Sequence, residues 1–133
     1  MPDYMHRALL RAYLQTAHNL LSGQALEIYS APWLGQIGQP AFYRQIAQMD
    51  QKYTDEIEGR YERMECPVTV LWGQNDEWIP FEKGVALATA ISDAECIAIP
   101  DSGHLVQEDR PEVIVAAVLK QLAKGEIQPQ AWR

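Results

Sequence analysis

The sequence predicts an α/β fold built around a short parallel sheet. Two apolar runs, Val68–Trp72 and Cys96–Ile99, have the length and character of buried strands. A stretch with helical periodicity separates them, which is the sequence form of a strand-helix-strand unit with parallel strands. Further helical patterns precede the first run and follow the second. Helices are therefore expected to flank the sheet.

The first 64 residues are predicted to be helical with intervening loops. Apolar residues recur at helical spacing from Met5 to Leu21, and Ser22-Gly23 would stop this amphipathic helix. A loop rich in proline and glycine is expected to run up to Pro40, which would then lie in the first turn of a second helix. A further apolar face at helical spacing follows in residues 53–61.

After the first strand, Pro80 is predicted to start a helix that packs on the sheet, with a turn at 92–94 before the second strand. Asp109 and Glu112 resemble a capping box at the start of a last helix that ends at Lys124-Gly125. The predicted organisation is a helical region (1–64), an α/β region (65–125) and a loose tail (126–133).

An acid and a base follow the two predicted strands at nearly equal offsets. They are Asp76 and His104. Because parallel strands joined by a right-handed crossover end at the same edge of a sheet, both side chains are expected where open α/β sheets hold their active sites. A carboxylate within about 2.6–3.2 Å of a ring nitrogen would form a catalytic relay. The alternatives are a turn role for Asp76 and a loop role for His104.

These motifs, in this order, resemble the C-terminal portion of the α/β-hydrolase family. The resemblance covers about Glu65 to Ala123, and is carried by Cys-Pro before the first strand, Gly-Gln-Asn-Asp after it, Trp-Ile-Pro, Asp-Ser-Gly-His-Leu and Gln-Glu-Asp-Arg-Pro-Glu. In that family the nucleophile precedes the acid and the acid precedes the histidine. The resemblance implies a partial α/β-hydrolase fold, with Asp76 as triad acid, His104 as triad base and a lid-like helical region.

The nucleophile of that family has no counterpart in the sequence. It normally lies in a Gly-x-Ser-x-Gly turn between a strand and a helix, where small neighbours permit a strained backbone. No serine here lies between glycines with this spacing, no aspartate occupies such a turn, and neither Cys66 nor Cys96 fits. The resemblance therefore implies that the nucleophile half lies outside this chain, and the chain alone is expected to be inactive.

Two functions remain open at this point. The chain is either part of a hydrolase for an ester, amide or halogenated small molecule, or a non-catalytic relative that serves as an interaction or oligomerisation module. Trp33 and Tyr43 are candidate substrate contacts if the helical region is a lid. Trp78, two residues after the acid, is expected either to line a pocket mouth or to pack against the start of the next helix.

Composition restricts the class of protein. A hydrophobic content of 47% with 22% charged residues indicates a folded chain, and a net charge of −7 argues against a nucleic-acid partner. No apolar run reaches the roughly 18 residues of a membrane span, and the N-terminus lacks a signal pattern. The sequence thus predicts a cytoplasmic protein with reduced cysteines. No His, Cys, Asp and Glu set has metal-ligand spacing, so neither a metal nor a cofactor is expected.

The predicted sheet also implies a partner. Two strands alone form a marginal structure, and the Val68–Trp72 strand would keep one open edge. Exposed strand edges recruit other chains by strand pairing. We therefore expect a homo-oligomer, or association with a missing N-terminal half.

Overall fold

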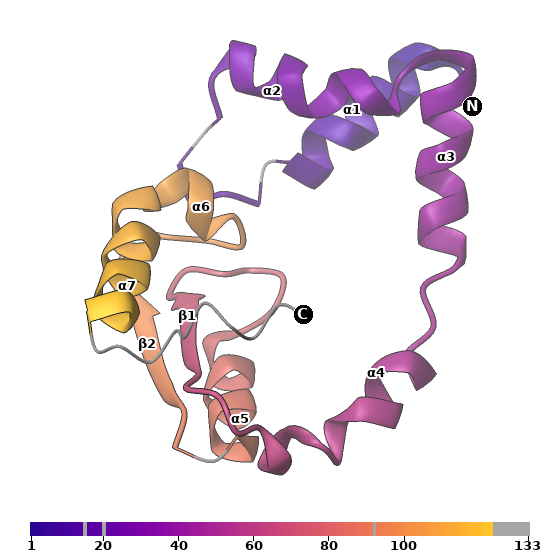
Figure 1. Cartoon of the computed structure of the whole chain (residues 1–133). Coiled ribbons are helices and arrows are strands. Elements are labelled where there is room, and N and C mark those ends of the chain that lie inside the picture. Colours follow the sequence, from indigo (N-terminus) through magenta and orange to yellow (C-terminus); the bar gives the residue numbers. More distant parts are fainter. Residues whose placement is uncertain (15, 20, 92, 124–133) are drawn as a thin grey trace.

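The computed structural model of the protein describes residues 1–14, 16–19, 21–91 and 93–123. The predicted helix end at 124–125 and the predicted tail at 126–133 lie outside the described residues, as does Ser92 of the predicted turn. The chain divides into helices that precede the sheet and an α/β part that contains it (Figure 1). The predicted domain boundary between residues 64 and 65 stays a prediction.

The region before the sheet is helical, as predicted, but its elements begin and end at other residues. The described elements are α1 (Asp3–Leu14), α2 (Gly23–Ser30), the 3-10 turn η1 (Ala31–Trp33), α3 (Gly35–Ala47), α4 (Lys52–Glu58) and the 3-10 turn η2 (Tyr61–Arg63). The prediction that one helix runs on to Leu21 is wrong, because α1 ends at Leu14. Ser22 starts a helix instead of stopping one: its hydroxyl accepts the Ala25 N–H at 3.1 Å, as an N-cap does.

The position of Pro40 also differs from the prediction. Pro40 lies inside α3, which begins five residues earlier at Gly35, a residue with φ of +72°. Residues 35–40, which were expected to lie in a loop, are helical, and η1 packs closely against them. A Cβ atom at Gly38 would lie 2.4 Å from the carbonyl oxygen of Pro32, so only glycine allows this approach.

An aromatic cluster forms the core of the helical region. Phe42 is 7% exposed and lies at its centre. His6 of α1 is also buried, with 1% exposure. Its Nε2 atom lies 2.8 Å from the carbonyl oxygen of Trp33, and its Nδ1 atom lies 3.1 Å from the hydroxyl of Tyr43. A buried imidazole with both nitrogens bonded ties α1 to α3 and η1.

The α/β part has the predicted strand-helix-strand order. Strands β1 (Thr69–Gly73) and β2 (Glu95–Ile99) are parallel and pair over their whole length, from Thr69 opposite Glu95 to Gly73 opposite Ile99. The helices of this part are α5 (Phe81–Ala90), α6 (Val106–Asp109) and α7 (Pro111–Ala123). The α/β class with a short parallel sheet is therefore confirmed among the described residues.

The helices α5 and α7 lie on opposite faces of the sheet. Side chains alternate along a strand, so neighbouring residues face opposite sides. Trp72 points toward α5, where Gly84 leaves room for its indole ring. Leu71 and Ile97 point the other way and, with Ala116 and Ala117 of α7, line a small cavity of about 210 Å³. The sheet is thus the middle layer of three.

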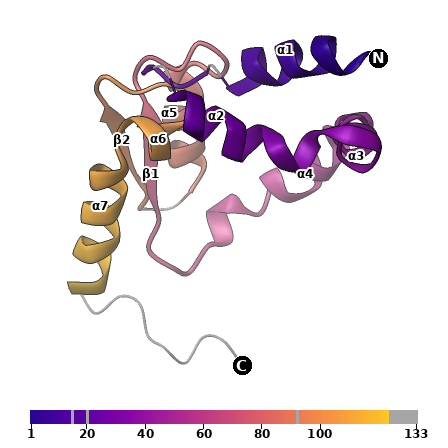
Figure 2. The ribbon, with the colours of Figure 1, turned by 90° about the horizontal axis from the view of Figure 1, so that it is seen from above.

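The apolar face of α7 is only partly covered. Four of its large side chains are between 50% and 60% exposed, namely Val115, Val118, Leu119 and Leu122. The helix lies at the outer end of the molecule, away from the helical region (Figure 2). Separately, none of the described helices combines the length and the apolar character that crossing a bilayer requires.

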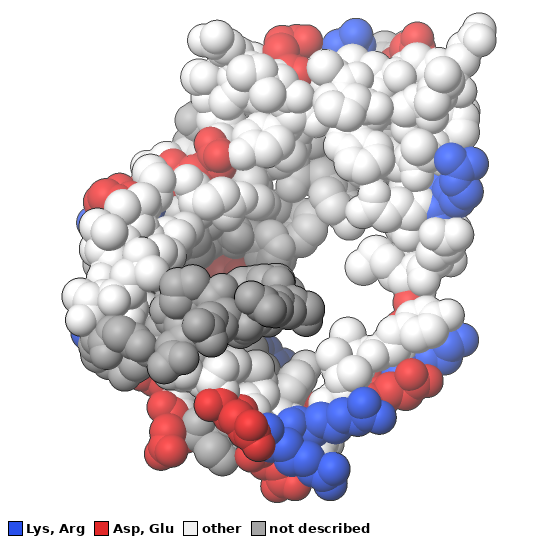
Figure 3. Space-filling model, in the orientation of Figure 1, with Lys and Arg blue, Asp and Glu red and all other residues white. Residues whose placement is uncertain are grey.

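The helical region arches away from the sheet, so that the chain surrounds an opening in the view of Figure 1. In the space-filling view, side chains of both charges gather along the lower rim, over α4 and η2, whereas the upper face over α1 to α3 is mostly uncharged (Figure 3). The sheet and the helical region meet at the top of the sheet, where both strands end.

Candidate active site

The loops that follow the two strands are in direct contact. A Cβ atom at Gly73, the last residue of β1, would lie 2.1 Å from the carbonyl oxygen of Gly103 and 2.7 Å from that of Ser102. The Asn75 N–H donates to the Ser102 carbonyl at 2.8 Å, and the Gln74 N–H donates to the Ile99 carbonyl at 2.9 Å. These contacts fix the spacing between the loop of Asp76 and the loop of His104.

We expect a Gly73→Ala substitution to destabilise the chain by about 1–3 kcal/mol, because the added methyl group would push two backbone carbonyls apart. Urea unfolding followed by circular dichroism would measure this difference. Gly59→Ala is the matched control, since Gly59 has nothing within 4 Å of the Cβ position and a φ of −67°. A Gly73 variant as stable as the Gly59 variant would show that the loops tolerate a wider spacing.

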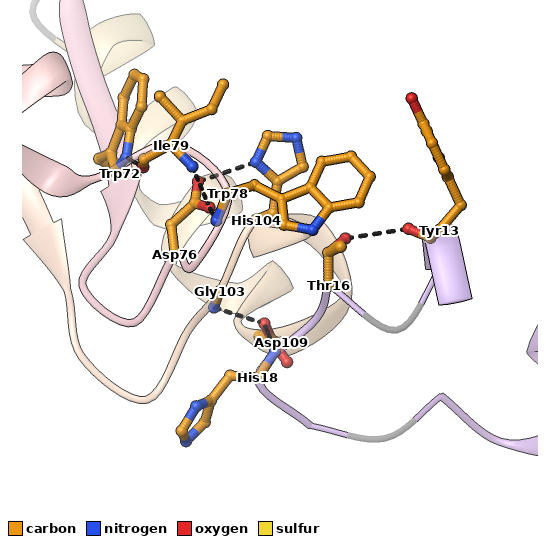
Figure 4. Close-up of polar contacts among 10 residues, drawn as sticks. All are labelled: Tyr13, Thr16, His18, Trp72, Asp76, Trp78, Ile79, Gly103, His104 and Asp109. Carbon is orange, nitrogen blue, oxygen red and sulfur yellow. Dashed lines mark hydrogen bonds and ion pairs between the residues drawn. The ribbon is translucent and has the colours of Figure 1, made fainter. Parts of the chain in front are cut away.

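Asp76 lies in a tight turn and bonds through both carboxylate oxygens (Figure 4). Its Oδ1 atom accepts the backbone N–H groups of Trp78 and Ile79, each at 2.9 Å. Its Oδ2 atom lies 2.9 Å from His104 Nδ1, so the predicted separation is confirmed. The turn role and the partnership with the histidine are therefore compatible, because each uses a different oxygen. The Asp76 side chain is 5% exposed.

The carboxylate of Asp76 is held in its charged form. Burial alone would raise its pKa, but the hydrogen bonds from the Ile79 N–H, the His104 ring and the Trp78 N–H outweigh burial, so the pKa of Asp76 lies below its ordinary value. Because an ionised carboxylate only accepts hydrogen bonds, His104 must donate from Nδ1–H. In the neutral imidazole, this tautomer leaves the lone pair on Nε2, as a general base requires.

The lowered pKa predicts a pH dependence of stability. A carboxyl group whose pKa is lower in the folded state stabilises the fold above its unfolded pKa of about 3.9, and this contribution is lost as pH falls through the folded value. We expect the unfolding free energy of Asp76→Asn to fall less steeply than that of the wild type as pH is lowered below about 4. Urea titrations at several pH values would measure both slopes. Equal slopes in the wild type and the variant would mean that the pKa of Asp76 is the same in the folded and the unfolded state.

His104 lies between the acid and an aromatic ring. Its side chain is 31% exposed, and its ring centroid lies 5.3 Å from that of Trp78 at an interplanar angle of 36°. The Trp78 ring in turn meets Tyr13 of α1 edge-to-face, with centroids 4.7 Å apart. The Trp78 side chain therefore lies between the Asp76–His104 pair and the helical region (Figure 4). Its role in substrate binding stays a prediction.

Trp33 and Tyr43, the other predicted substrate contacts, lie further into the helical region. The rings of both pack around Phe42, with centroids 5.8 Å and 5.4 Å from it. Tyr13 connects this cluster to the site, since it contacts Phe42 as well as Trp78. The structure therefore gives Trp33 and Tyr43 a packing role and leaves their contact with a substrate as a prediction.

The hydroxyl and thiol groups nearest to the strands are poor candidates for a nucleophile. Ser102 is fully buried, with 0% exposure, and its hydroxyl has no hydrogen-bond partner among the residues that the structure describes. Cys96 lies within β2, and burial raises the pKa of its thiol, which keeps it protonated. Cys66 is an exposed free thiol that precedes β1, at the opposite end from the loops of Asp76 and His104.

Asp109 is a polar residue next to the site whose position the sequence does not reveal. The prediction that Asp109 caps the last helix is wrong: it ends α6, and its carboxylate binds backbone N–H groups of Gly103, His18 and Asn19. The first of these groups belongs to the loop of His104. No local pattern could reveal these bonds, because two of the donors lie about ninety residues earlier in the chain.

Comparison with known proteins finds similar chains among hydrolases. A model of the Alpha/beta hydrolase family matches residues 2–117. An uncharacterised hydrolase of Bacillus subtilis, YugF, is 30% identical over 82 residues, which are 58% of this chain and 30% of that protein. A 2-hydroxy-6-oxononadienedioate/2-hydroxy-6-oxononatrienedioate hydrolase of Klebsiella pneumoniae is 29% identical over 66 residues, which are 50% of this chain and 23% of that protein.

Among solved structures, an α/β hydrolase fold protein from Burkholderia ambifaria is 53% identical, with a TM-score of 0.86. That match covers 90% of this chain but 45% of the Burkholderia chain. A meta-cleavage product hydrolase shares the fold at 14% identity, with a TM-score of 0.74. This chain therefore spans less than half the length of these relatives. Because the family model extends over most of its residues, the chain belongs to the α/β hydrolase family.

Proposed function

We propose that this chain provides the acid and the base of a hydrolase active site, and that a segment outside it provides the nucleophile. Asp76 would be the acid and His104 the base. The observation that carries the proposal is the 2.9 Å contact between Asp76 Oδ2 and His104 Nδ1 at the edge where both parallel strands end. The substrate would be a small ester, amide or halogenated compound.

For an acyl substrate, each group has a distinct part in the reaction. His104 Nε2 would accept the proton of the nucleophile as the nucleophile attacks the carbonyl carbon, and would later donate that proton to the leaving group. Asp76 would hold the ring in the tautomer that leaves Nε2 free and would stabilise the imidazolium. The two N–H groups on Oδ1 keep Oδ2 directed at the ring, so the pair is arranged before a substrate arrives.

The proposal can be tested by supplying the missing part. The chain would be produced alone and together with the portion of the Burkholderia protein that it does not match. We expect a serine-directed fluorophosphonate to label the assembled protein, and the assembly to hydrolyse activated esters. The chain alone should do neither beyond the rate of free imidazole. Labelling of the chain alone would reveal a nucleophile within it, and a stable assembly without label or turnover would contradict the proposal.

A second candidate function is that of an interaction module. Two observations favour it: the half-exposed apolar stripe on α7, and a described sheet in which β1 pairs with β2 alone and keeps one edge open. Such surfaces suit a second copy of the chain or a missing half of the fold.

Sedimentation of the purified chain tests this second candidate function directly, and we expect a dimer or a larger species. Leu119→Lys, which adds a charge to the α7 stripe, should weaken association if the stripe forms the interface. Lys83→Leu, on the opposite helix, serves as the control because it removes a charge elsewhere. A compact monomer at high micromolar concentration would exclude self-association.

A further inference from the structure

We propose that Asp109 is a positioning residue that fixes the loop of the base His104 to the start of the helical region. This inference rests on the proposed function, because it concerns how that base is held. Asp109 does not touch the imidazole ring. It acts through the backbone of Gly103, the residue immediately before His104, and through the segment of residues 16–19, which follows α1.

One carboxylate here accepts four hydrogen bonds from two distant parts of the chain. The Oδ2 atom accepts the N–H groups of Gly103 and His18, each at 2.8 Å. The Oδ1 atom accepts the backbone N–H of Asn19 at 2.7 Å and the Nδ2 group of the same residue at 3.1 Å. An ionised acceptor strengthens each of these bonds, and its removal would leave three backbone donors without a partner.

Two further contacts join the same segments without the help of Asp109. The His104 N–H donates to the Thr16 carbonyl at 2.9 Å. A Cβ atom at Gly103 would lie 2.6 Å from that same carbonyl oxygen and 2.8 Å from the backbone nitrogen of His18, so glycine is needed for the approach. The two segments are therefore in close backbone contact, and Asp109 bonds to both of them (Figure 4).

The loop of His104 is thus held from two sides. On one side the Ser102 carbonyl accepts the Asn75 N–H of the Asp76 turn. On the other side Gly103 binds Asp109 and His104 binds Thr16. Loss of the Asp109 bonds would leave the second side held by the single bond between His104 and Thr16, and His104 could then rotate away from Asp76. Burial alone would raise the pKa of Asp109, but bonds from Gly103, Asn19 and His18 hold that pKa below its usual value. The Asp109 carboxylate is therefore charged at neutral pH.

The neighbouring residue Glu108 offers a matched comparison. It lies on the same short helix, α6, and its carboxylate accepts the hydroxyl of Tyr29 from α2. Both acids therefore bind the helical region, but of the two carboxylates only that of Asp109 accepts a hydrogen bond from the loop of His104 among the described residues. Replacing Glu108 removes one negative charge and one contact to the helical region, and leaves the bonds of Gly103 intact.

The first experiment uses the wild-type chain and nuclear magnetic resonance. The amide protons of Gly103, His18 and Asn19 should shift together as pH is lowered, with one shared midpoint below the ordinary carboxyl value of about 3.9. That midpoint should match the pKa read from the Asp109 carboxyl carbon. Independent midpoints for the three amides would overturn the proposal, because they would show that the amides do not share one carboxylate.

The second experiment compares Asp109→Asn with Glu108→Gln. In Asp109→Asn we expect the downfield Nδ1 proton signal of His104 to be lost, and exchange of the His104 amide to accelerate at least about 10-fold. Glu108→Gln should retain both properties. An unchanged Nδ1 signal in a folded Asp109→Asn chain, or equal losses in the two variants, would overturn the proposal. If Asp109→Asn does not fold, the wild-type titration decides.

These measurements require neither a nucleophile nor a substrate. If the amides titrate together but the assembled protein is not labelled by the fluorophosphonate, the positioning role of Asp109 is supported and the proposed function is contradicted. If labelling succeeds but the Asp109→Asn variant keeps the Nδ1 proton signal of His104, the proposed function is supported and the positioning role of Asp109 is contradicted.

Discussion

In the assembled enzyme, His104→Ala is expected to lower kcat by about 10³–10⁴-fold, because no other group would take the proton of the nucleophile. KM should change little, since the imidazole acts mainly in the transition state. Steady-state hydrolysis of a nitrophenyl ester would give both constants.

His18→Ala is the control for this prediction. The side chain of His18 is exposed, and its bond to Asp109 uses the backbone N–H, which alanine retains. This variant should keep wild-type kcat. A loss of less than about 10-fold in His104→Ala would mean that His104 is not the base, since general base catalysis contributes at least that much.

Phe42→Ala is expected to destabilise the helical region by about 3–5 kcal/mol, the usual cost of deleting a buried aromatic side chain. Four rings surround Phe42 with centroid distances of 5.4 to 5.8 Å, those of His6, Tyr13, Trp33 and Tyr43. Truncation of Phe42 would leave a cavity among these four rings, and such rigid rings fill a cavity poorly. Urea unfolding followed by circular dichroism would report the change, because most of the helical signal comes from this region.

Ile37→Ala on the same helix serves as the comparison. Ile37 is 86% exposed, so its truncation removes little buried surface and should change stability by no more than about 0.5 kcal/mol. If Phe42→Ala costs as little as Ile37→Ala, the aromatic cluster is not the core of the helical region.

The sheet and the Asp76–His104 pair could be predicted because short-range rules determine both. Two apolar runs separated by one helix can pair in parallel with a single handedness, and that handedness puts the residues after both strands at one edge. Asp76 and His104 are 28 residues apart, yet the topology leaves few other positions for them. Pro80 likewise precedes α5 directly, because its fixed φ and missing N–H suit the start of a helix.

The helical region could be predicted as helical but not in its boundaries or its core. His6 has no local signal for burial, since both of its partners come from later elements, at Trp33 and Tyr43. Ser22-Gly23 suits the end of one helix as well as the start of another, and the choice depends on tertiary packing. Pro40 lies inside α3 because packing of the aromatic cluster outweighs one lost backbone hydrogen bond.

The placement of the contacts between the two parts of the chain has an evolutionary consequence. Among the described residues, the polar and ring contacts that join the helical region to the α/β part gather at the end nearest His104, around Tyr13, the 16–19 segment and Tyr29. Residues farther along the arch, in α3 and α4, can therefore diverge without moving Asp76 and His104. In this layout, natural variation can change the far end of the arch while the contact between Asp76 and His104 is inherited unchanged.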